Sequence, residues 1–449
     1  MSDNPQMDAG AAPSGIEDPG LPNAGAVVAA PAAGAAEVEA AFELPRIARA
    51  LRHRDFRLFW GGNFLSNIGT WMQNVAQGWV VLKLTGSPFW LGVVGFASSI
   101  PILLFALIGG VIADHVNRRK MLIITQSVMM VSAFIMAWLA YRNTIKVYEI
   151  VLLALLTGIA MSFNTPSYQA LVPELVPRED LTNAIALNSA QFNMSRVVGP
   201  TLGGLAMAVF GAAGNFFLNG LSFLAVIVAL TRMRSVRGEN TPEGGLWDKL
   251  KDGFRYVFSH AEMSSLVVLV AIGSLLAVPY LTFVPYFARE VLHIGVTGFG
   301  ALMACSGAGA FFGAATIAHI GVVRRGTAFV VWAGTGFFSS IILFTFSRSF
   351  YLSGFFLMAA GYFMILMVAT INSLLQHMAE DHMRGRVMSI YSTAFLGLPP
   401  IGSLIAGSLS HVFTAPHVIA GMSAVAMVGT IFLAAKPAKL EPKPHHWSE

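Results

Sequence analysis

Long apolar segments alternate with short polar connections along most of this chain. Each segment holds roughly 20 residues or more, which is enough to cross a hydrocarbon layer of about 30 Å at about 1.5 Å per residue. A membrane β-barrel would instead show short stretches of alternating polarity. The pattern therefore predicts an all-α membrane protein with twelve transmembrane helices. These helices are expected near residues 58–82, 90–113, 120–140, 148–168, 183–209, 212–231, 263–288, 298–319, 327–346, 351–375, 387–413 and 416–435.

The polar connections divide the chain into five regions. The longest connection, residues 232–262, separates six predicted helices from six. We interpret it as a cytoplasmic linker between an N-terminal six-helix bundle, residues 46–231, and a C-terminal six-helix bundle, residues 263–435. Residues 1–45 are rich in Ala, Gly and Pro and contain no Lys or Arg, which predicts a disordered cytoplasmic tail. Residues 436–449 form a second cytoplasmic tail.

Composition and charge agree with a membrane location. Of the 449 residues, 55% are hydrophobic and only 11% are charged, whereas soluble domains carry about 25% charged residues. If the N-terminus is cytoplasmic, 22 of the 28 Lys and Arg residues lie on the cytoplasmic side and five lie outside. This asymmetry follows the positive-inside rule and places both termini of a multi-pass inner-membrane protein in the cytoplasm. It also accounts for the net charge of +5 without a nucleic-acid partner.

The two halves of the sequence echo one another. The run Ile112–His115 after the second predicted helix corresponds to Ile317–His319 after the eighth, and a pair of arginines follows each. The Gly199–Gly204 stretch of the fifth helix corresponds to Pro399–Gly402 in the eleventh. Weak internal symmetry of this kind is typical of secondary transporters built from repeats, in which the substrate site lies near mid-membrane.

One charged connection carries a recognisable motif. The stretch Gly109–Lys120 resembles the cytoplasmic signature of the major facilitator superfamily. The matching residues are Gly110, Asp114, Arg118 and Arg119. His115 and Asn117 depart from the signature, which has a basic residue and a glycine there. The resemblance covers roughly residues 50–435 and implies a fold of two pseudo-symmetric six-helix bundles.

Two further resemblances narrow the family. The fifth helix resembles an antiporter signature, and the matching residues are Gly199, Pro200, Gly203 and Gly204. Ala186 and Ser195 replace two glycines of that signature but are still small. The runs Leu51–Trp60, Pro173–Arg178 and Arg384–Ser389 resemble the enterobactin-exporter-like branch. That branch implies export of siderophores or other amphiphilic small molecules.

The resemblance also implies a cytoplasmic gate. Asp114 would cap the cytoplasmic end of the eleventh helix, near Arg386, when the inner gate is closed. An acid at a helix N-terminus is stabilised by the helix dipole by about 0.3–1 kcal/mol at an exposed site. The alternative is a positive-inside loop that contains an incidental aspartate.

The first predicted helix is unusually polar along one side. Its polar residues recur at spacings of three and four, which places them on one helix face. They are Asn63, Asn67, Thr70, Asn74 and Gln77. Amides that faced lipid would each cost several kcal/mol, so the face must meet protein or water. Because the first helix lines the central cavity in the resembled superfamily, we predict that the stripe lines a substrate cavity. An interhelical polar seam is the alternative.

Arg196 lies deep in the fifth predicted helix, about 20 Å from its cytoplasmic end at 1.5 Å per residue. A charge at that depth is costly and is a functional-site hypothesis by default. We assign it to the substrate cavity, where it could attract an anionic group of the substrate. The alternative is a structural donor to carbonyls or to amides such as Asn67 or Asn188.

The sequence has no Gly-rich phosphate loop and no nucleophile or metal-ligand set, so we predict no enzyme, cofactor or metal site. We expect a monomeric secondary active transporter that exports a small amphiphilic molecule, siderophore-like or drug-like, by alternating access. No Asp or Glu lies in the core of a predicted helix, so proton coupling rests on the resemblance and facilitated diffusion stays open. A broad multidrug exporter and a non-transporting membrane receptor on the same fold also fit these sequence features.

Overall fold

The computed structural model describes residues 46–233, 246–320, 326–380 and 382–434, and every regular element in these ranges is a helix. The first half comprises η1 (Arg46–Arg52), α1 (Arg54–Thr85), α2 (Pro88–His115), α3 (Arg118–Tyr141), α4 (Val147–Leu171), η2 (Val172–Leu175), η3 (Arg178–Asp180) and α5 (Leu181–Arg232). The second half comprises α6 (Leu246–Ser259), α7 (Ala261–Leu276), α8 (Tyr280–Tyr286), η4 (Phe287–Val291), α9 (Val296–Ile320), α10 (Gly326–Phe346), α11 (Phe350–Met378), α12 (Arg384–Gly397), α13 (Pro399–Leu409) and α14 (Ala415–Ala434). The two tails expected at residues 1–45 and 436–449 lie outside the described residues.

The number of membrane-length helices matches the sequence prediction. Ten segments within the described residues are long and apolar enough to span a membrane. One of them contains two helices, because α5 turns at Gly211, where φ is 66°. Asn215 then donates to the carbonyl of Gly203, so the second arm of α5 folds back along the first. The 32-residue α1 completes the set despite its polar stripe. The prediction of twelve transmembrane helices is confirmed.

Proline and glycine explain where the helices break. The predicted seventh helix is divided into α7, α8 and a π-helical turn, because Pro279 and Pro285 lack the N–H that continues a helix. The predicted eleventh helix is divided into α12 and α13 before Pro399 and Pro400. Helix α1 ends at Gly86, whose φ of 61° is left-handed and suits a residue without a Cβ.

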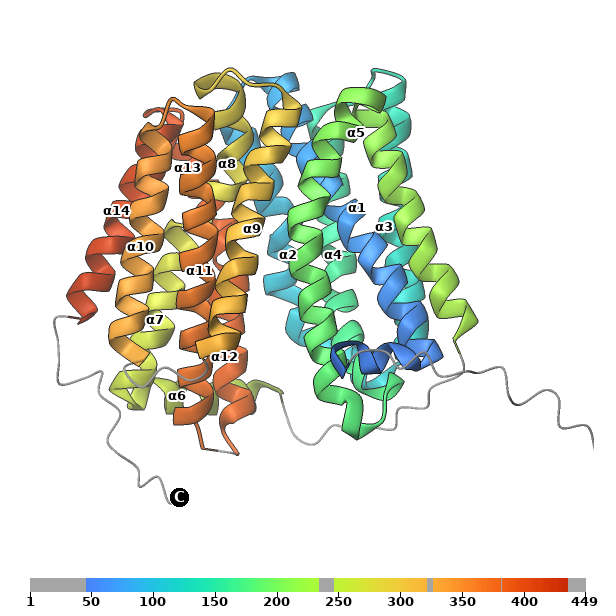
Figure 1. The fold of residues 1–449 in the computed structure, drawn as a ribbon, viewed down its shortest axis with the longest axis vertical. Coiled ribbons are helices and arrows are strands. Elements are labelled where there is room, and N and C mark those ends of the chain that lie inside the picture. Colours follow the sequence, from blue (N-terminus) through green and yellow to red (C-terminus); the bar gives the residue numbers. More distant parts are fainter. Residues whose placement is uncertain (1–45, 234–245, 321–325, 381, 435–449) are drawn as a thin grey trace, which may run out of the picture. The chain divides into compact units, whose positions relative to one another are not determined.

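The helices form two bundles, α1–α5 and α7–α14, which lie side by side in Figure 1. The core of the second bundle is dominated by buried aromatic rings, among them Tyr280, Phe283, Phe287, Phe337 and Phe344. The buried amide side chains of the described residues, such as Asn63, Gln126 and Asn164, instead all lie in the first bundle. Together the bundles make the pseudo-symmetric major facilitator architecture that the sequence predicts, but with interiors of different chemistry.

The amphipathic helix α6 was not expected from the sequence. It lies in the segment that we predicted to be a polar linker, and it packs against α7 and α12. Gly253 of α6 closely approaches Arg386, and the hydroxyl of Tyr256 accepts a hydrogen bond from the backbone N–H of Glu380. The linker region is therefore attached to the second bundle through α6.

The two bundles meet closely at one end, which we call the joined end and which lies at the top of Figure 1. It carries the connections at residues 86–87, 142–146, 292–295, 347–349 and 410–414. Arg289 Nη1 of the second bundle donates to the carbonyl of Leu82 in the first at 2.9 Å. The rings of Trp79 and Phe299 stack with centroids 6.2 Å apart.

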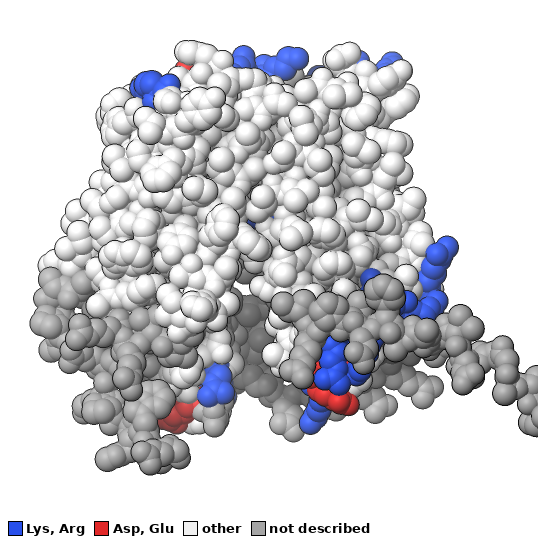
Figure 2. Space-filling model, in the orientation of Figure 1, with Lys and Arg blue, Asp and Glu red and all other residues white. Residues whose placement is uncertain are grey.

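Charged side chains gather at the two ends of the molecule. On the face shown in Figure 2, the broad band between the ends is almost free of Lys, Arg, Asp and Glu. Large apolar side chains on the outside of the helices remain exposed, including Leu152, Trp332, Phe355 and Val425. An uncharged belt with exposed apolar side chains matches the hydrocarbon layer of a bilayer.

A buried carboxylate ties the start of α1 to the start of α5. Asp180 is only 1% exposed, and its Oδ2 lies 2.8 Å from Arg52 Nη2 and 2.7 Å from His53 Nε2. Arg49 Nε lies 3.3 Å from Oδ1 of the same group. The N–H of Ala50 also donates to Asn183 Oδ1 at 2.8 Å. Arg49 and Arg52 of the basic N-terminal segment thus form ion pairs with Asp180 inside the protein.

We expect the variant Asp180→Asn to unfold at a lower temperature than the unaltered protein, because Arg49, Arg52 and His53 lose the anion that they share. Thermal unfolding in detergent measures the difference. The matched control is Glu179→Gln, which removes an exposed neighbouring charge and should leave Tm unchanged. Equal Tm values for the two variants would contradict the structural role of Asp180.

Candidate functional site

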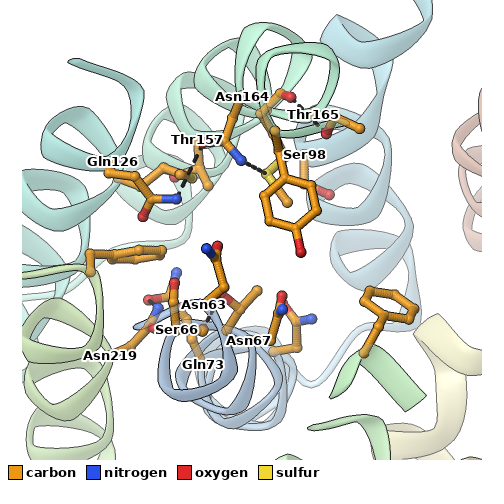
Figure 3. A pocket seen from close by; sticks show the side chains of 18 of the residues that line it. Asn63, Ser66, Asn67, Gln73, Ser98, Gln126, Thr157, Asn164, Thr165 and Asn219 are labelled. Atoms are coloured by element: carbon orange, nitrogen blue, oxygen red, sulfur yellow. Dashed lines mark hydrogen bonds between the residues drawn. The ribbon is translucent and has the colours of Figure 1, made fainter. Parts of the chain in front are cut away.

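The first bundle encloses a cavity of about 500 Å³, which we call the amide chamber. Its lining residues run from Asn63 to Phe223 and all belong to α1–α5. Asn63 of α1 points toward Gln126 of α3 and Asn164 of α4 across the cavity (Figure 3). The chamber is therefore walled by one bundle and is rich in side chains that donate and accept hydrogen bonds.

The polar stripe of α1 forms one wall of the amide chamber. All five residues of the stripe line it. Asn63 Nδ2 donates to the carbonyl of Phe59, and Thr70 Oγ1 donates to that of Ser66, each at 2.9 Å. Asn67, Asn74 and Gln77 make no hydrogen bond to any residue in the described part of the chain. Their amides are therefore available to a ligand or to water.

The opposite wall holds polar residues that the sequence analysis did not select. Asn164 Oδ1 accepts from Thr125 Oγ1 at 3.0 Å and from Gln126 Nε2 at 3.2 Å. Beside the stripe, Gln73 Oε1 of α1 accepts from Asn219 Nδ2 of α5 at 2.7 Å. The sequence did contain a sign of them, because an amide side chain within an apolar helix needs a polar partner inside the protein. Spacing did not reveal these residues, since they are scattered over four helices.

Three buried oxygens at the chamber wall have no hydrogen-bond partner among the described residues. They are Gln126 Oε1, Thr157 Oγ1 and Asn188 Oδ1. A buried polar atom without a partner costs about 1–3 kcal/mol, and most such atoms in native proteins are paired. Water or a bound molecule in the chamber can supply the missing partners.

The amide chamber has no charged wall. None of the described residues that line it is Asp, Glu, Lys, Arg or His. An ionised group placed there would lose water without gaining a counter-charge, which is costly. The chamber therefore suits an uncharged group with several hydrogen-bonding atoms.

Arg196 does not line the amide chamber. Its side chain is 9% exposed, and its guanidinium lies 5.9 Å from the centre of the Trp71 ring. It makes no hydrogen bond or ion pair with any described residue, Asn67 and Asn188 included. The backbone of Arg196 packs closely on Gly307 of α9. The structure thus places this cation against the Trp71 ring, at the contact between the two bundles.

Three of the residues predicted to form the gate, Arg118, Arg119 and Arg386, have contacts within their own halves of the protein. Arg118 pairs with Glu174 of η2, and Arg119 Nη2 donates to the carbonyl of Thr231 at 2.8 Å. Arg386 Nη1 lies 3.1 Å from Asp252 Oδ2 of α6. Gly110 and Asp114 belong to α2, but their side-chain surroundings lie outside the described part of the structure.

The small residues of the fifth-helix motif permit close helix packing on two sides. A Cβ on Gly199 would lie 2.5 Å from Trp71 Cβ, and one on Gly203 would lie 2.8 Å from Met72 Cα. Both distances are too short for a side chain, so these glycines allow α1 to pack closely against α5. A Cβ on Gly204 would lie 3.0 Å from the carbonyl oxygen of Val296, so this glycine admits α9. Pro200 is buried between them. The motif therefore joins the cavity wall to the second bundle.

Twelve membrane helices among the described residues, arranged in two bundles with an amide-lined cavity inside the membrane region, are typical of transporters of small molecules. The chain belongs to the major facilitator superfamily: residues 48–444 match the family described as transmembrane secretion effector. The family assignment made from the sequence motifs is confirmed.

Curated relatives lie on the exporter side of the superfamily. The staphyloferrin A transporter of Staphylococcus aureus is 25% identical over 86% of this chain and 97% of its own length. The multidrug efflux pump Tap of Mycolicibacterium fortuitum is 27% identical over 75% and 84%. The enterobactin exporter EntS of Citrobacter koseri is 23% identical over 84% and 90%. The resemblance to the enterobactin-exporter-like branch is thereby confirmed.

Solved structures agree on the fold. A mutant of the nucleoside transporter NupG superposes with a TM-score of 0.72, covering 85% of this chain and all of that chain at 12% identity. At that identity the likeness shows the major facilitator fold alone.

We expect Gly204→Val to push α5 away from α9, because the new side chain would meet backbone atoms that cannot rotate aside. Spin labels on Thr144→Cys and Arg348→Cys, in a Cys305→Ser background, report the separation of the bundles at the joined end. The label distances should shift to longer values.

The control for this experiment is Leu205→Val, because Leu205 is 51% exposed on the outer side of the same helix. Its distance distribution should match that of the unaltered protein. A Gly204→Val distribution that also matches would show that the glycine does not set the contact between the bundles.

Proposed function

We propose that this protein exports a small amphiphilic molecule, siderophore-like or drug-like, across the inner membrane by alternating access. The observation that carries the proposal is the amide chamber, an uncharged polar cavity in the membrane region with three unpartnered buried oxygens. Its wall offers amides and hydroxyls to uncharged hydroxamate, amide, carbonyl or hydroxyl groups of a substrate. The relatives, which include a staphyloferrin A transporter, an enterobactin exporter and a multidrug efflux pump, support the same class of cargo.

In this proposal the two halves, residues 46–231 and 263–435, rock about the joined end, and both termini are cytoplasmic. Contacts at the joined end and the pairing of Arg386 with Asp252 of α6 support a state that receives substrate from the cytoplasm. The gate formed by Gly110, Asp114, Arg118, Arg119 and Arg386 would close in the opposite state. We further propose that protons drive the cycle and that the protein works as a monomer.

Asn67, Asn74 and Gln77 are the proposed substrate contacts on α1, together with Asn63 and Thr70. Arg196 has a different proposed role, since it faces Trp71 at the contact between the bundles. There it would influence the conformational change, and it is poorly placed to bind an anionic group in the chamber.

The function is tested first by deleting the protein. Cells that lack it should accumulate the exported compound and become sensitive to it, when siderophores and drugs are compared as two panels. Selective accumulation of one siderophore class supports siderophore export, whereas sensitivity to many unrelated drugs supports a broad multidrug exporter. Unchanged accumulation of all compounds would contradict export.

We expect Asn67→Ala to raise the apparent KM for the exported compound about two- to thirteenfold, the effect of losing one hydrogen bond of about 0.5–1.5 kcal/mol. Flux into inside-out vesicles measures it at matched protein levels. The control is Leu65→Ala on the same helix, where Leu65 is 55% exposed on the outer side. A loss of expression with unchanged KM would instead indicate a structural polar seam.

We expect a pH gradient to stimulate flux in proteoliposomes when the acidic side is the one to which the substrate is delivered. A protonophore should abolish this stimulation. Equal flux with and without the gradient would indicate facilitated diffusion. Binding of the compound with no flux under either condition would indicate a receptor on the same fold.

A further inference from the structure

Helix α6 exposes two aromatic rings that lie side by side. Phe254 is 47% exposed and Phe258 is 55% exposed. Their rings stack almost parallel, with centroids 6.1 Å apart, so they form one continuous apolar surface. Removing such rings from water is favourable, and an exposed apolar patch of this kind marks a binding surface.

The helical spacing of α6 gives it an inner and an outer apolar side. Gly253 and Val257 are buried against the second bundle. Phe254 and Phe258 each follow one of these residues by one position, which places the rings about 100° further round the helix. Arg255 is exposed on the far side of the rings. The outer side of α6 therefore combines an aromatic pair with a cation at its edge.

The aromatic pair lies close to the start of a membrane helix. Only His260 separates α6 from α7, and the membrane-length segment Ala261–Val291 begins with α7. Helix α6 lies across the lower end of the second bundle in Figure 1, opposite the joined end. Phe258 precedes α7 by three residues, and each residue extends at most about 3.6 Å. The rings are thus within reach of the headgroup layer of a bilayer.

The charges of α6 favour an anionic surface. Arg255 forms no ion pair with any described residue, and its long side chain can reach lipid phosphate while the rings enter the apolar layer. The acid Asp252 is already paired with Arg386. The helix contains three basic and two acidic residues, namely Lys249, Lys251, Arg255, Asp248 and Asp252. Basic residues beside an apolar helix face are typical of helices that bind anionic lipid.

The preceding linker does not offer the same complement. Residues 234–245 contain a single large apolar residue, Val236, among charged, polar and glycine residues. A bilayer surface supplies both an apolar layer for the rings and phosphate for Arg255. The combination of rings and cation therefore fits lipid better than it fits this linker.

Helix α6 also contacts the start of α12. Asp252 Oδ2 lies 3.1 Å from Arg386 Nη1. A Cβ on Gly253 would lie 3.0 Å from Arg386 Cβ, so the two backbones approach closely. The hydroxyl of Tyr256 accepts a hydrogen bond from the N–H of Glu380 at 3.4 Å. An interaction that fixes α6 therefore also restrains the first turn of α12.

We infer that Phe254, Phe258 and Arg255 form a docking surface for the anionic headgroup layer of the bilayer, and that docking orders the start of α12. The rings enter the apolar edge of the layer, and Arg255 contacts lipid phosphate. This goes beyond the proposed function and requires neither flux nor a known cargo. Because Arg386 also belongs to the proposed gate, the charge of the membrane surface would then influence gate closure.

The first experiment measures how deeply α6 enters the bilayer. The full chain carries Cys305→Ser, which removes its one cysteine, and a single spin label at Phe258→Cys or at Ser259→Cys, an exposed position on the polar side of α6. Label accessibility is measured to oxygen, which partitions into lipid, and to a neutral nickel chelate, which stays in water. The vesicles are POPC alone and a mixture in which about one third of the lipid is anionic POPG.

The label at position 258 should favour oxygen, and the label at position 259 should favour the nickel chelate. POPG should increase the inserted population at position 258, and NaCl at about 1 M should remove this increase, because the Debye length falls to about 3 Å. Arg255→Gln should lower the ratio of inserted to free label in POPG about fivefold. The matched control Lys83→Gln, which removes an exposed cation at the joined end, should leave that ratio unchanged.

The second experiment measures the order of α12. A spin label at Ser389→Cys, an exposed position in the first turns of α12, should be less mobile in POPG vesicles than in POPC. Asp252→Asn should remove this difference, while the label at position 258 still inserts. A label at Val425→Cys, which is 62% exposed on α14, should have the same mobility in both vesicles.

Separate outcomes would overturn each part of the inference. A label at position 258 that favours the nickel chelate in both vesicles would overturn docking. Low accessibility to both reagents, equal with and without POPG, would show that protein covers the rings, and dilution with unlabelled chain would distinguish a second copy from a tail of the same chain. Insertion with equal mobility at position 389 would overturn only the link to α12. Since no readout measures transport, these failures are distinguishable from a failure of the proposed function.

Discussion

The structure depends on one constraint: an amide inside a membrane needs a polar partner that lipid cannot provide. Five polar residues recur on one face of α1, and this face of the helix cannot lie against lipid. Helix α1 must lie inside the first bundle, with that face toward other polar side chains. Asn164, Gln126 and Asn219 supply part of the counterpart. The cavity between the two polar walls is therefore a consequence of the same pattern that positions the helix.

Close packing of small residues then couples this cavity to the rest of the protein. Gly199 and Gly203 bring α5 against α1, which carries one cavity wall, and Gly204 brings α5 against α9 of the other bundle. One helix therefore contacts both the substrate site and the partner half. Close-packed backbones transmit small displacements because they have no flexible side chains between them to absorb the change. This arrangement gives a physical reason for a glycine-rich motif at the contact between the bundles.

The sequence was most informative where a physical rule acts locally. Hydrophobic length set the boundaries of α2 and α9 to within a few residues, and helical spacing grouped Asn63 with Gln77. Local rules could not find the second wall of the chamber, because the contact of Gln126 with Asn164 forms only in the folded bundle. Helix α6 was missed because its apolar residues are too few for a span, and the surrounding polar residues suggested a linker. The sequence showed that burying the charge of Arg196 in the membrane costs free energy. Its contact with Trp71, however, depends on how α5 is rotated about its axis, which depth in the membrane alone does not specify.

The two halves share a topology but have different interiors, and this difference bears on how a transporter of this kind distinguishes cargo. The core of the second bundle includes many buried aromatic rings, such as Phe283 and Phe337. The first bundle holds the polar cavity, whose wall is without charge. An uncharged wall of rotatable amides discriminates weakly among molecules with similar numbers of donors and acceptors, because each contact contributes only about 0.5–1.5 kcal/mol.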